Sequence, residues 1–136
     1  MRELRQPVVF VTGKGGVGKS SVAAALARAE ADRGGQAILV EFEDAAGATR
    51  ALGAEADGVT PLVIEYLEAL AHAIASMLGS RLLGKLVVKQ RTLKKVVQAV
   101  PAVRELVSLD RLRSFRTESP RARVFVDLPA TGHAVD

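Results

Sequence analysis

The chain has 136 residues, 49% of them hydrophobic, a formal net charge of +4 and no cysteine. This length and composition fit one domain with its own core, and no stretch is apolar enough to predict a membrane span. The lack of cysteine excludes disulfides and thiolate metal sites, so we expect a cytoplasmic location.

The positive charge is concentrated in one part of the chain, because residues 81–123 hold 12 of the 19 Lys and Arg residues. A basic run such as Lys89–Lys95 fits either the solvated face of a helix or a contact with nucleic acid or an acidic membrane surface. No aromatic residue interleaves these basic residues before Phe115. Because base stacking needs aromatic side chains, we do not expect nucleic acid as a partner.

The first predicted elements form a βαβ unit. An apolar run predicts a buried strand at Val8–Thr12, and an Ala-rich segment predicts a helix over Lys19–Arg33. Gly34-Gly35 is typical of a helix end. Gln36–Phe42 predicts a second buried strand, parallel to the first, with acidic residues at the carboxyl end, where open α/β sheets place ligands.

Between the first strand and the helix, residues 13–20 read Gly-Lys-Gly-Gly-Val-Gly-Lys-Ser and satisfy the phosphate-loop pattern G-x-x-x-x-G-K-S/T. A glycine-rich turn can match by chance, but here a strand precedes the pattern and a helix follows it. The glycines let backbone N–H groups turn inward, Lys19 supplies positive charge, and the Ser20 hydroxyl is a suitable Mg²⁺ ligand. The predicted nucleotide-binding residues are Gly13, Lys14, Gly15, Gly16, Val17, Gly18, Lys19, Ser20 and Ser21.

Residues 45–60 predict a loop and a short helix, and a mostly helical region follows. Thr60-Pro61 matches a helix cap followed by proline at the first helical position, so a helix is predicted from there to Gly79. The other elements predicted in this region are helices over Arg81–Val97 and from Pro101 to about Leu109, and a polar connector at Ser114–Pro120.

The third predicted strand, Arg123–Leu128, carries Asp127. A hydrophobic strand that ends in aspartate places a carboxylate beside a phosphate loop, where it holds a water on Mg²⁺, although many buried strands end in this way. The predicted fold class is α/β: a P-loop NTPase with a parallel sheet flanked by helices, and a helical insertion between the second and third strands. Within one domain we expect the βαβ unit with the phosphate loop at residues 1–58 and the insertion at 59–119. Residues 120–136 are expected to hold the strand that carries Asp127 and, after it, the nucleotide-sensing segment known as switch II.

Two segments resemble one family of ATPases. Lys14, beside the first glycine of the loop, makes this segment similar to the deviant Walker A loop of the ParA, MinD, nitrogenase iron protein and ArsA/Get3 ATPases. The segment Asp127-Leu128-Pro129-Ala130-Thr131-Gly132-His133 resembles switch II of the ArsA/Get3 family, whereas ParA and MinD proteins rarely carry Thr-Gly-His there. The run Arg104-Glu105-Leu106 also resembles a helix of bacterial ArsA-type ATPases, so the resemblance spans nearly the whole chain.

The resemblance implies a role for each matching residue. Lys14 would act in trans on the nucleotide of a partner, and Asp127 would contact Mg²⁺ through water. Asp44 falls where the family's switch I aspartate positions the attacking water. The family usually has proline after that aspartate and this chain has Ala45, so Glu41 or Glu43 competes for the role. Thr131, Gly132 and His133 would sense the γ-phosphate.

The implied function is hydrolysis of ATP, with Mg²⁺, by a homodimer that closes on nucleotide to drive transport, client targeting or a regulatory switch. The metalloid-binding cysteines of the family are absent from the chain, so arsenite pumping is not supported. The apolar face of residues 62–78 fits either plain core packing or a groove for a hydrophobic client or membrane protein. The alternatives are a ParA/MinD-like positioning switch on DNA or membrane and a non-hydrolysing nucleotide-dependent scaffold.

Family members continue beyond this segment with further strands and the base-binding loops. We therefore expect residues 1–136 to be the N-terminal part of one P-loop ATPase domain, or one half of a split ATPase, with an incomplete sheet.

Overall fold

The structure is a computed structural model that describes residues 6–43, 47–53, 57–82, 86 and 91–130. The chain forms two compact units. The first, here called the sheet unit, comprises Met1–Val63 and Arg121–Asp136, and the second, the helical unit, comprises Ile64–Pro120.

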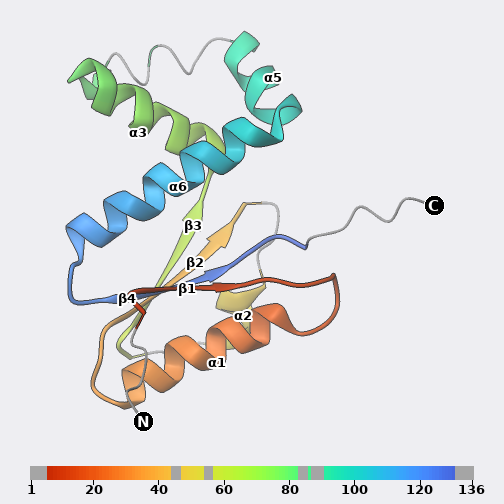
Figure 1. Cartoon of the computed structure of the whole chain (residues 1–136), viewed down its shortest axis with the longest axis vertical. Helices are drawn as coiled ribbons and strands as arrows, with labels where there is room; N and C mark the ends of the chain where they lie inside the picture. The colour runs from red at the N-terminus through yellow and green to blue at the C-terminus, as the bar shows by residue number, and fades with distance from the viewer. Residues whose placement is uncertain (1–5, 44–46, 54–56, 83–85, 87–90, 131–136) are drawn as a thin grey trace. The chain divides into compact units, whose positions relative to one another are not determined.

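The sheet unit is built on a parallel sheet of four strands (Figure 1). The strands are β1 (Val8–Val11), β2 (Ala37–Phe42), β3 (Val59–Ile64) and β4 (Arg123–Asp127), in the order β1-β4-β2-β3. β4 is central, because Phe125 pairs with Val9 on one side and with Leu39 on the other. The Ala37 N–H donates to the Gly58 carbonyl at 3.0 Å, so β3 begins beside the start of β2 and runs in the same direction.

Two helices, α1 (Lys19–Asp32) and α2 (Ala48–Leu52), pack on one face of this sheet. Small side chains let α1 approach the strands closely, and its buried residues are all alanines, Ala23, Ala24 and Ala27. They form one core with Leu39, Ala48, Val59 and Phe125. Gly34, at φ 79°, ends α1 in the left-handed region that glycine adopts without strain, as the sequence predicted.

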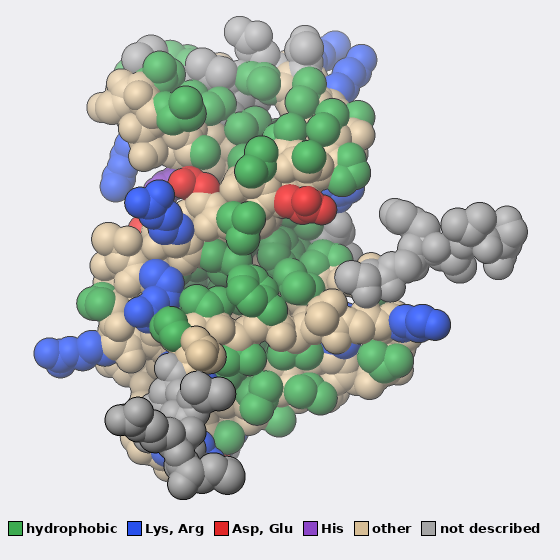
Figure 2. Space-filling view, in the orientation of Figure 1, with side chains coloured by type: hydrophobic (Ala, Val, Ile, Leu, Met, Phe, Trp, Pro, Cys, Tyr) green, Lys and Arg blue, Asp and Glu red, His purple; other side chains and the backbone are tan. Residues whose placement is uncertain are grey.

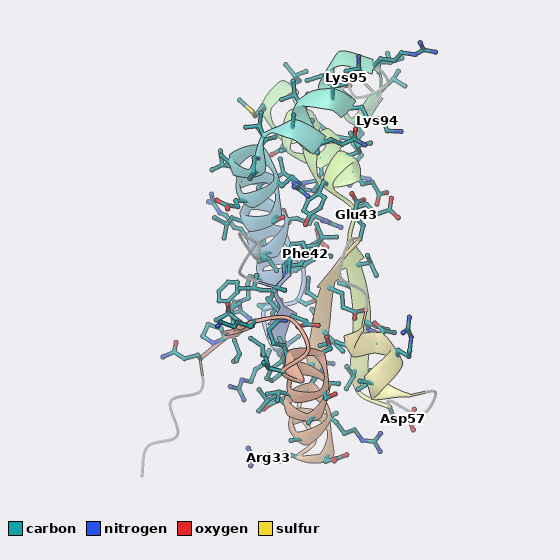
Figure 3. The ribbon with its side chains drawn as sticks, turned by 90° about the vertical axis from the view of Figure 1, so that its right-hand side faces the viewer. Arg33, Phe42, Glu43, Asp57, Lys94 and Lys95 are labelled. Carbon is teal, nitrogen blue, oxygen red and sulfur yellow. The ribbon has the colours of Figure 1, made fainter. Side chains whose placement is uncertain are left out.

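The helical unit contains α3 (Tyr66–Leu78), α5 (Arg91–Ala99) and α6 (Pro101–Glu118). The Arg104 guanidinium lies 5.2 Å from the centre of the Tyr66 ring, and His72 Nδ1 lies 3.7 Å from Asp110 Oδ2, so both contacts join α3 to α6. Lys94 and Lys95 extend from α5 (Figure 3).

Hydrophobic side chains are visible on the surface of the helical unit (Figure 2). Met77, in the last turn of α3, is 86% exposed. The apolar face predicted for residues 62–78 is therefore only partly covered. Within the described residues, no helix is both long and apolar enough to cross a membrane.

The predicted α/β class is confirmed, but the predicted helix start at Thr60-Pro61 is wrong. These residues belong to β3, and α3 begins at Tyr66. Proline lacks an N–H group, and an edge strand tolerates this because one side of the strand has no partner. The sheet therefore has a fourth strand, and the helical insertion follows the third strand in chain order rather than the second.

The polar connector predicted at Ser114–Pro120 is also wrong up to Glu118, because α6 continues through it. Polar residues are accommodated by bonds to carbonyls one turn back: the Ser114 hydroxyl donates to Asp110 O at 3.2 Å, and the Thr117 hydroxyl to Arg113 O at 3.3 Å. Phe115 is buried, which gives this end of α6 an apolar contact.

Candidate phosphate-binding site

The glycine-rich loop connects β1 to α1. Gly16 and Gly18 have backbone φ angles of 76° and 87°. Residues that carry a side chain rarely adopt such angles. Gly18 is the N-cap of α1, and no side chain of the described residues caps this helix end. The first amides of α1 therefore remain available to an anion, in the field of the positive end of the helix dipole.

Lys19 reaches back over this loop, because its ammonium donates to the Lys14 carbonyl at 3.3 Å. The ammonium charge is thus held at the loop itself. The neighbouring side chains of Lys14, Val17 and Ser21 are exposed. An anion bound by the loop would therefore interact with the positive charge of Lys19 in addition to the backbone amides.

The end of β4 brings Asp127 to the same place. Side chains alternate along a strand, so Asp127 faces α1 together with Phe125. Asp127 is paired with Val11, the last residue of β1, and the Leu128 N–H donates to the Val11 carbonyl at 3.1 Å. The Ser20 hydroxyl, in the first turn of α1, donates to Asp127 Oδ2 at 2.5 Å.

Asp127 is 2% exposed, and its second oxygen, Oδ1, is buried and has no hydrogen-bond partner among the described residues. A buried carboxylate oxygen without a partner is costly, so such an atom is often a ligand. Two oxygen donors side by side, from Ser20 and Asp127, suit a hard cation such as Mg²⁺. No group of three or more His, Cys, Asp or Glu side chains in the described part of the chain is placed to hold a metal.

Glu41, one of the two glutamates that compete with Asp44, has a different role in the structure. Its side chain is 1% exposed. Its Oε1 accepts the N–H groups of Gly47 at 2.7 Å, of Ala48, and of Thr49 at 3.0 Å, while Oε2 accepts the Thr49 hydroxyl. Glu41 thus caps the start of α2. Sequence reasoning missed this role, for which the only signal is a glutamate inside a buried strand with a short helix shortly after it.

The pKa of Glu41 reflects these contacts. Burial alone would raise the pKa, but the hydrogen bonds from the Thr49 hydroxyl and the amides of residues 47–49 outweigh burial and lower it from its ordinary value of 4.5. The carboxylate is therefore ionised at neutral pH, and both of its oxygens accept hydrogen bonds from α2.

The segments that follow β2 and β4 both approach the phosphate loop. A Cβ atom at Gly47 would lie 3.0 Å from Ser20 Oγ, and one at Gly15 would lie 3.8 Å from Ala130 Cβ. Glu43 is exposed in the turn after β2 (Figure 3). Asp44, Thr131, Gly132 and His133 lie outside the described residues, so their predicted roles stay predictions.

A strand, a glycine-rich loop with Lys19 and Ser20, a helix and an aspartate at the end of a neighbouring parallel strand define the class of P-loop nucleotide-binding proteins. The sequence profile of the anion-transporting ATPase family (ArsA_ATPase) matches residues 6–136, and the chain belongs to this family. This confirms the family predicted from Lys14 and the segment after Asp127. Comparison with curated proteins and with solved structures gave no match.

Proposed function

We propose that the chain binds ATP with Mg²⁺ at the phosphate loop and hydrolyses it to ADP and phosphate. The family is one of ATPases. The observation that carries the proposal is the contact between Ser20 and Asp127, at 2.5 Å, together with Asp127 Oδ1, which accepts no hydrogen bond from the part of the chain that the structure describes. This places a hydroxyl and a carboxylate beside a loop built for phosphate, as magnesium-dependent phosphoryl transfer requires.

The loop amides and the Lys19 ammonium would bind the phosphates and neutralise their charge. Ser20 would hold the Mg²⁺ directly and Asp127 would hold it through water. When bound, Mg²⁺ neutralises the charge on the β- and γ-phosphate oxygens.

The attacking water would be positioned by Asp44. Glu41 is the weaker candidate for that role, because its carboxylate already accepts hydrogen bonds from three amides and a hydroxyl. Glu43 is exposed and remains the second candidate. Release of the γ-phosphate would be sensed by Thr131, Gly132 and His133.

The proposal extends to a homodimer in which Lys14 contacts the nucleotide of the partner subunit. Its exposed side chain supports this, because the ammonium is accessible at the loop surface. Closure of such a dimer on ATP and its opening after hydrolysis would drive transport, client targeting or a regulatory switch.

The test is calorimetric titration of Mg·ATP into the purified chain, combined with a phosphate-release assay. Lys19→Ala should abolish binding, whereas Lys94→Ala, which removes the same charge from α5, should leave the affinity unchanged. Binding and phosphate release that are both lost in the Lys19 variant alone support the ATPase. Binding without phosphate release would favour the non-hydrolysing scaffold, and a folded wild-type chain that binds no nucleotide would contradict the proposal for this chain.

A further inference from the structure

The contacts of Glu41 fix the position of one short helix. Within the described residues, the donors to its carboxylate belong to Gly47, Ala48 and Thr49, which form the start of α2. α2 has only 5 residues, and so short a helix is not stable by itself. The position of its first turn therefore depends on the carboxylate that caps it and on the packing of Ala48, which is fully buried against α1.

That first turn lies directly against the phosphate loop. At Gly47, a Cβ atom would be 3.0 Å from Ser20 Oγ and 3.3 Å from Ser20 Cβ. The backbone of residue 47 thus forms one wall beside the Ser20 hydroxyl, and Asp127 accepts the hydrogen bond of that hydroxyl. A shift of the first turn of α2 would remove this wall.

We propose that Glu41 is a positioning residue of the phosphate site: by holding the first turn of α2 it keeps Gly47 against Ser20, and so fixes the hydroxyl beside Asp127. The inference rests on the proposed function, in which Ser20 binds Mg²⁺. In this role Glu41 would act through the first turn of α2, which its carboxylate contacts, rather than through a contact of its own with nucleotide or metal. Groups that orient a metal ligand in this indirect way commonly have large effects on affinity.

The positioning role predicts a specific loss. Without the cap, the loop amides and Lys19 still bind phosphate, so the affinity for ATP without Mg²⁺ should change little. The gain in affinity on adding Mg²⁺ should fall about tenfold, because the Ser20 hydroxyl is no longer held in place. A merely structural role would lower stability and leave this gain unchanged.

A matched pair of variants at Thr49 isolates the contact. Thr49→Val has nearly the same shape but cannot donate to Glu41 Oε2, whereas Thr49→Ser keeps the hydroxyl. The exposed fraction of Thr49 is high enough that neither change affects the core. The third variant is Glu41→Gln, which removes the charge. If Glu41→Gln does not fold, the two Thr49 variants test the positioning role.

The experiment measures ATP affinity by calorimetry with and without Mg²⁺ for the whole chain and each variant, after chemical denaturation has confirmed folding. In parallel, backbone amide NMR of the nucleotide-free chain compares the shifts at Lys19 and Ser20. We expect Thr49→Val and Glu41→Gln to reduce the Mg²⁺-dependent gain and to shift the Ser20 amide, and Thr49→Ser to restore both.

An unchanged Mg²⁺-dependent gain in both Glu41→Gln and Thr49→Val, or amide shifts confined to residues 47–49, would overturn the positioning role. If the wild-type chain binds no nucleotide, the proposed function fails for this chain. The amide shifts then decide the positioning role alone, because they are measured without nucleotide. The two failures are therefore distinguishable.

Discussion

Arg123, the first residue of β4, donates a hydrogen bond of 2.7 Å to Glu30 in the last turn of α1. The same guanidinium donates from Nε to the Gln6 carbonyl at 3.1 Å. At the other end of the same helix and strand, Ser20 donates to Asp127. α1 and β4 are thus joined by an ion pair at one end and by the candidate site at the other, so mutations can separate stability from binding.

Arg123→Met should lower the free energy of unfolding by about 2 kcal/mol, because Glu30 would keep a mostly buried charge without its partner. The two side chains are only 22% and 12% exposed. Urea denaturation measures the change.

The control is Arg28→Met, which breaks the pair with Asp32 on the surface of α1, where the two side chains are 48% and 63% exposed. That change should cost about 0.5 kcal/mol or less, and equal losses in the two variants would show that burial of the Arg123 pair does not matter.

Asp127→Asn should leave the free energy of unfolding unchanged or raise it, because the variant removes a buried charge whose Oδ1 has no hydrogen-bond partner in the residues that the structure describes. The same variant should weaken Mg·ATP binding about tenfold or more, since the amide is a poor partner for water on Mg²⁺. Denaturation and calorimetry on the same sample test both parts. Asp57→Asn, the same substitution at an exposed aspartate in the turn before β3, is the control that should change neither. A destabilised Asp127→Asn variant with normal binding would contradict the assignment of the site.

The phosphate loop was predictable because its information is local: glycine positions, Lys19 and Ser20 follow one another in the sequence. Asp127 was predictable because a parallel strand delivers its last residue to the same edge of the sheet. The start of α3 was not predictable, since a Thr-Pro pair fits both a helix start and an edge strand, and only the pairing with β2 decides. The capping role of Glu41 depends on how α2 folds back over the end of β2, which no local pattern encodes.

Stability should also depend on the ionisation of Glu41. Its pKa is lowered in the folded state, so its contribution is fully present above the ordinary value of 4.5 and is lost as the pH falls through the lowered folded value. Urea denaturation between neutral pH and about pH 3 should therefore show a decline below that ordinary value, and Glu41→Gln should lack this part of the decline. Glu118→Gln, at a side chain that is 57% exposed, serves as the control. If the wild type and Glu41→Gln decline in parallel, the hydrogen bonds to Glu41 do not favour its charged form.

Lys14→Ala should separate nucleotide binding from dimer closure. The contact that Lys14 makes with Lys19 comes from its backbone carbonyl, so the variant keeps it, and the affinity of the single chain for Mg·ATP should stay within about twofold of the wild type. If the side chain acts on the partner's nucleotide, ATP-dependent dimerisation in sedimentation velocity should disappear, and phosphate release should fall on the order of a thousandfold, as for other charges supplied in trans.

Lys95→Ala removes an equal charge from α5 and should leave both measurements unchanged. A Lys14→Ala chain that dimerises and releases phosphate normally would show that this lysine is a solvated loop residue, and the dimer would then need another explanation.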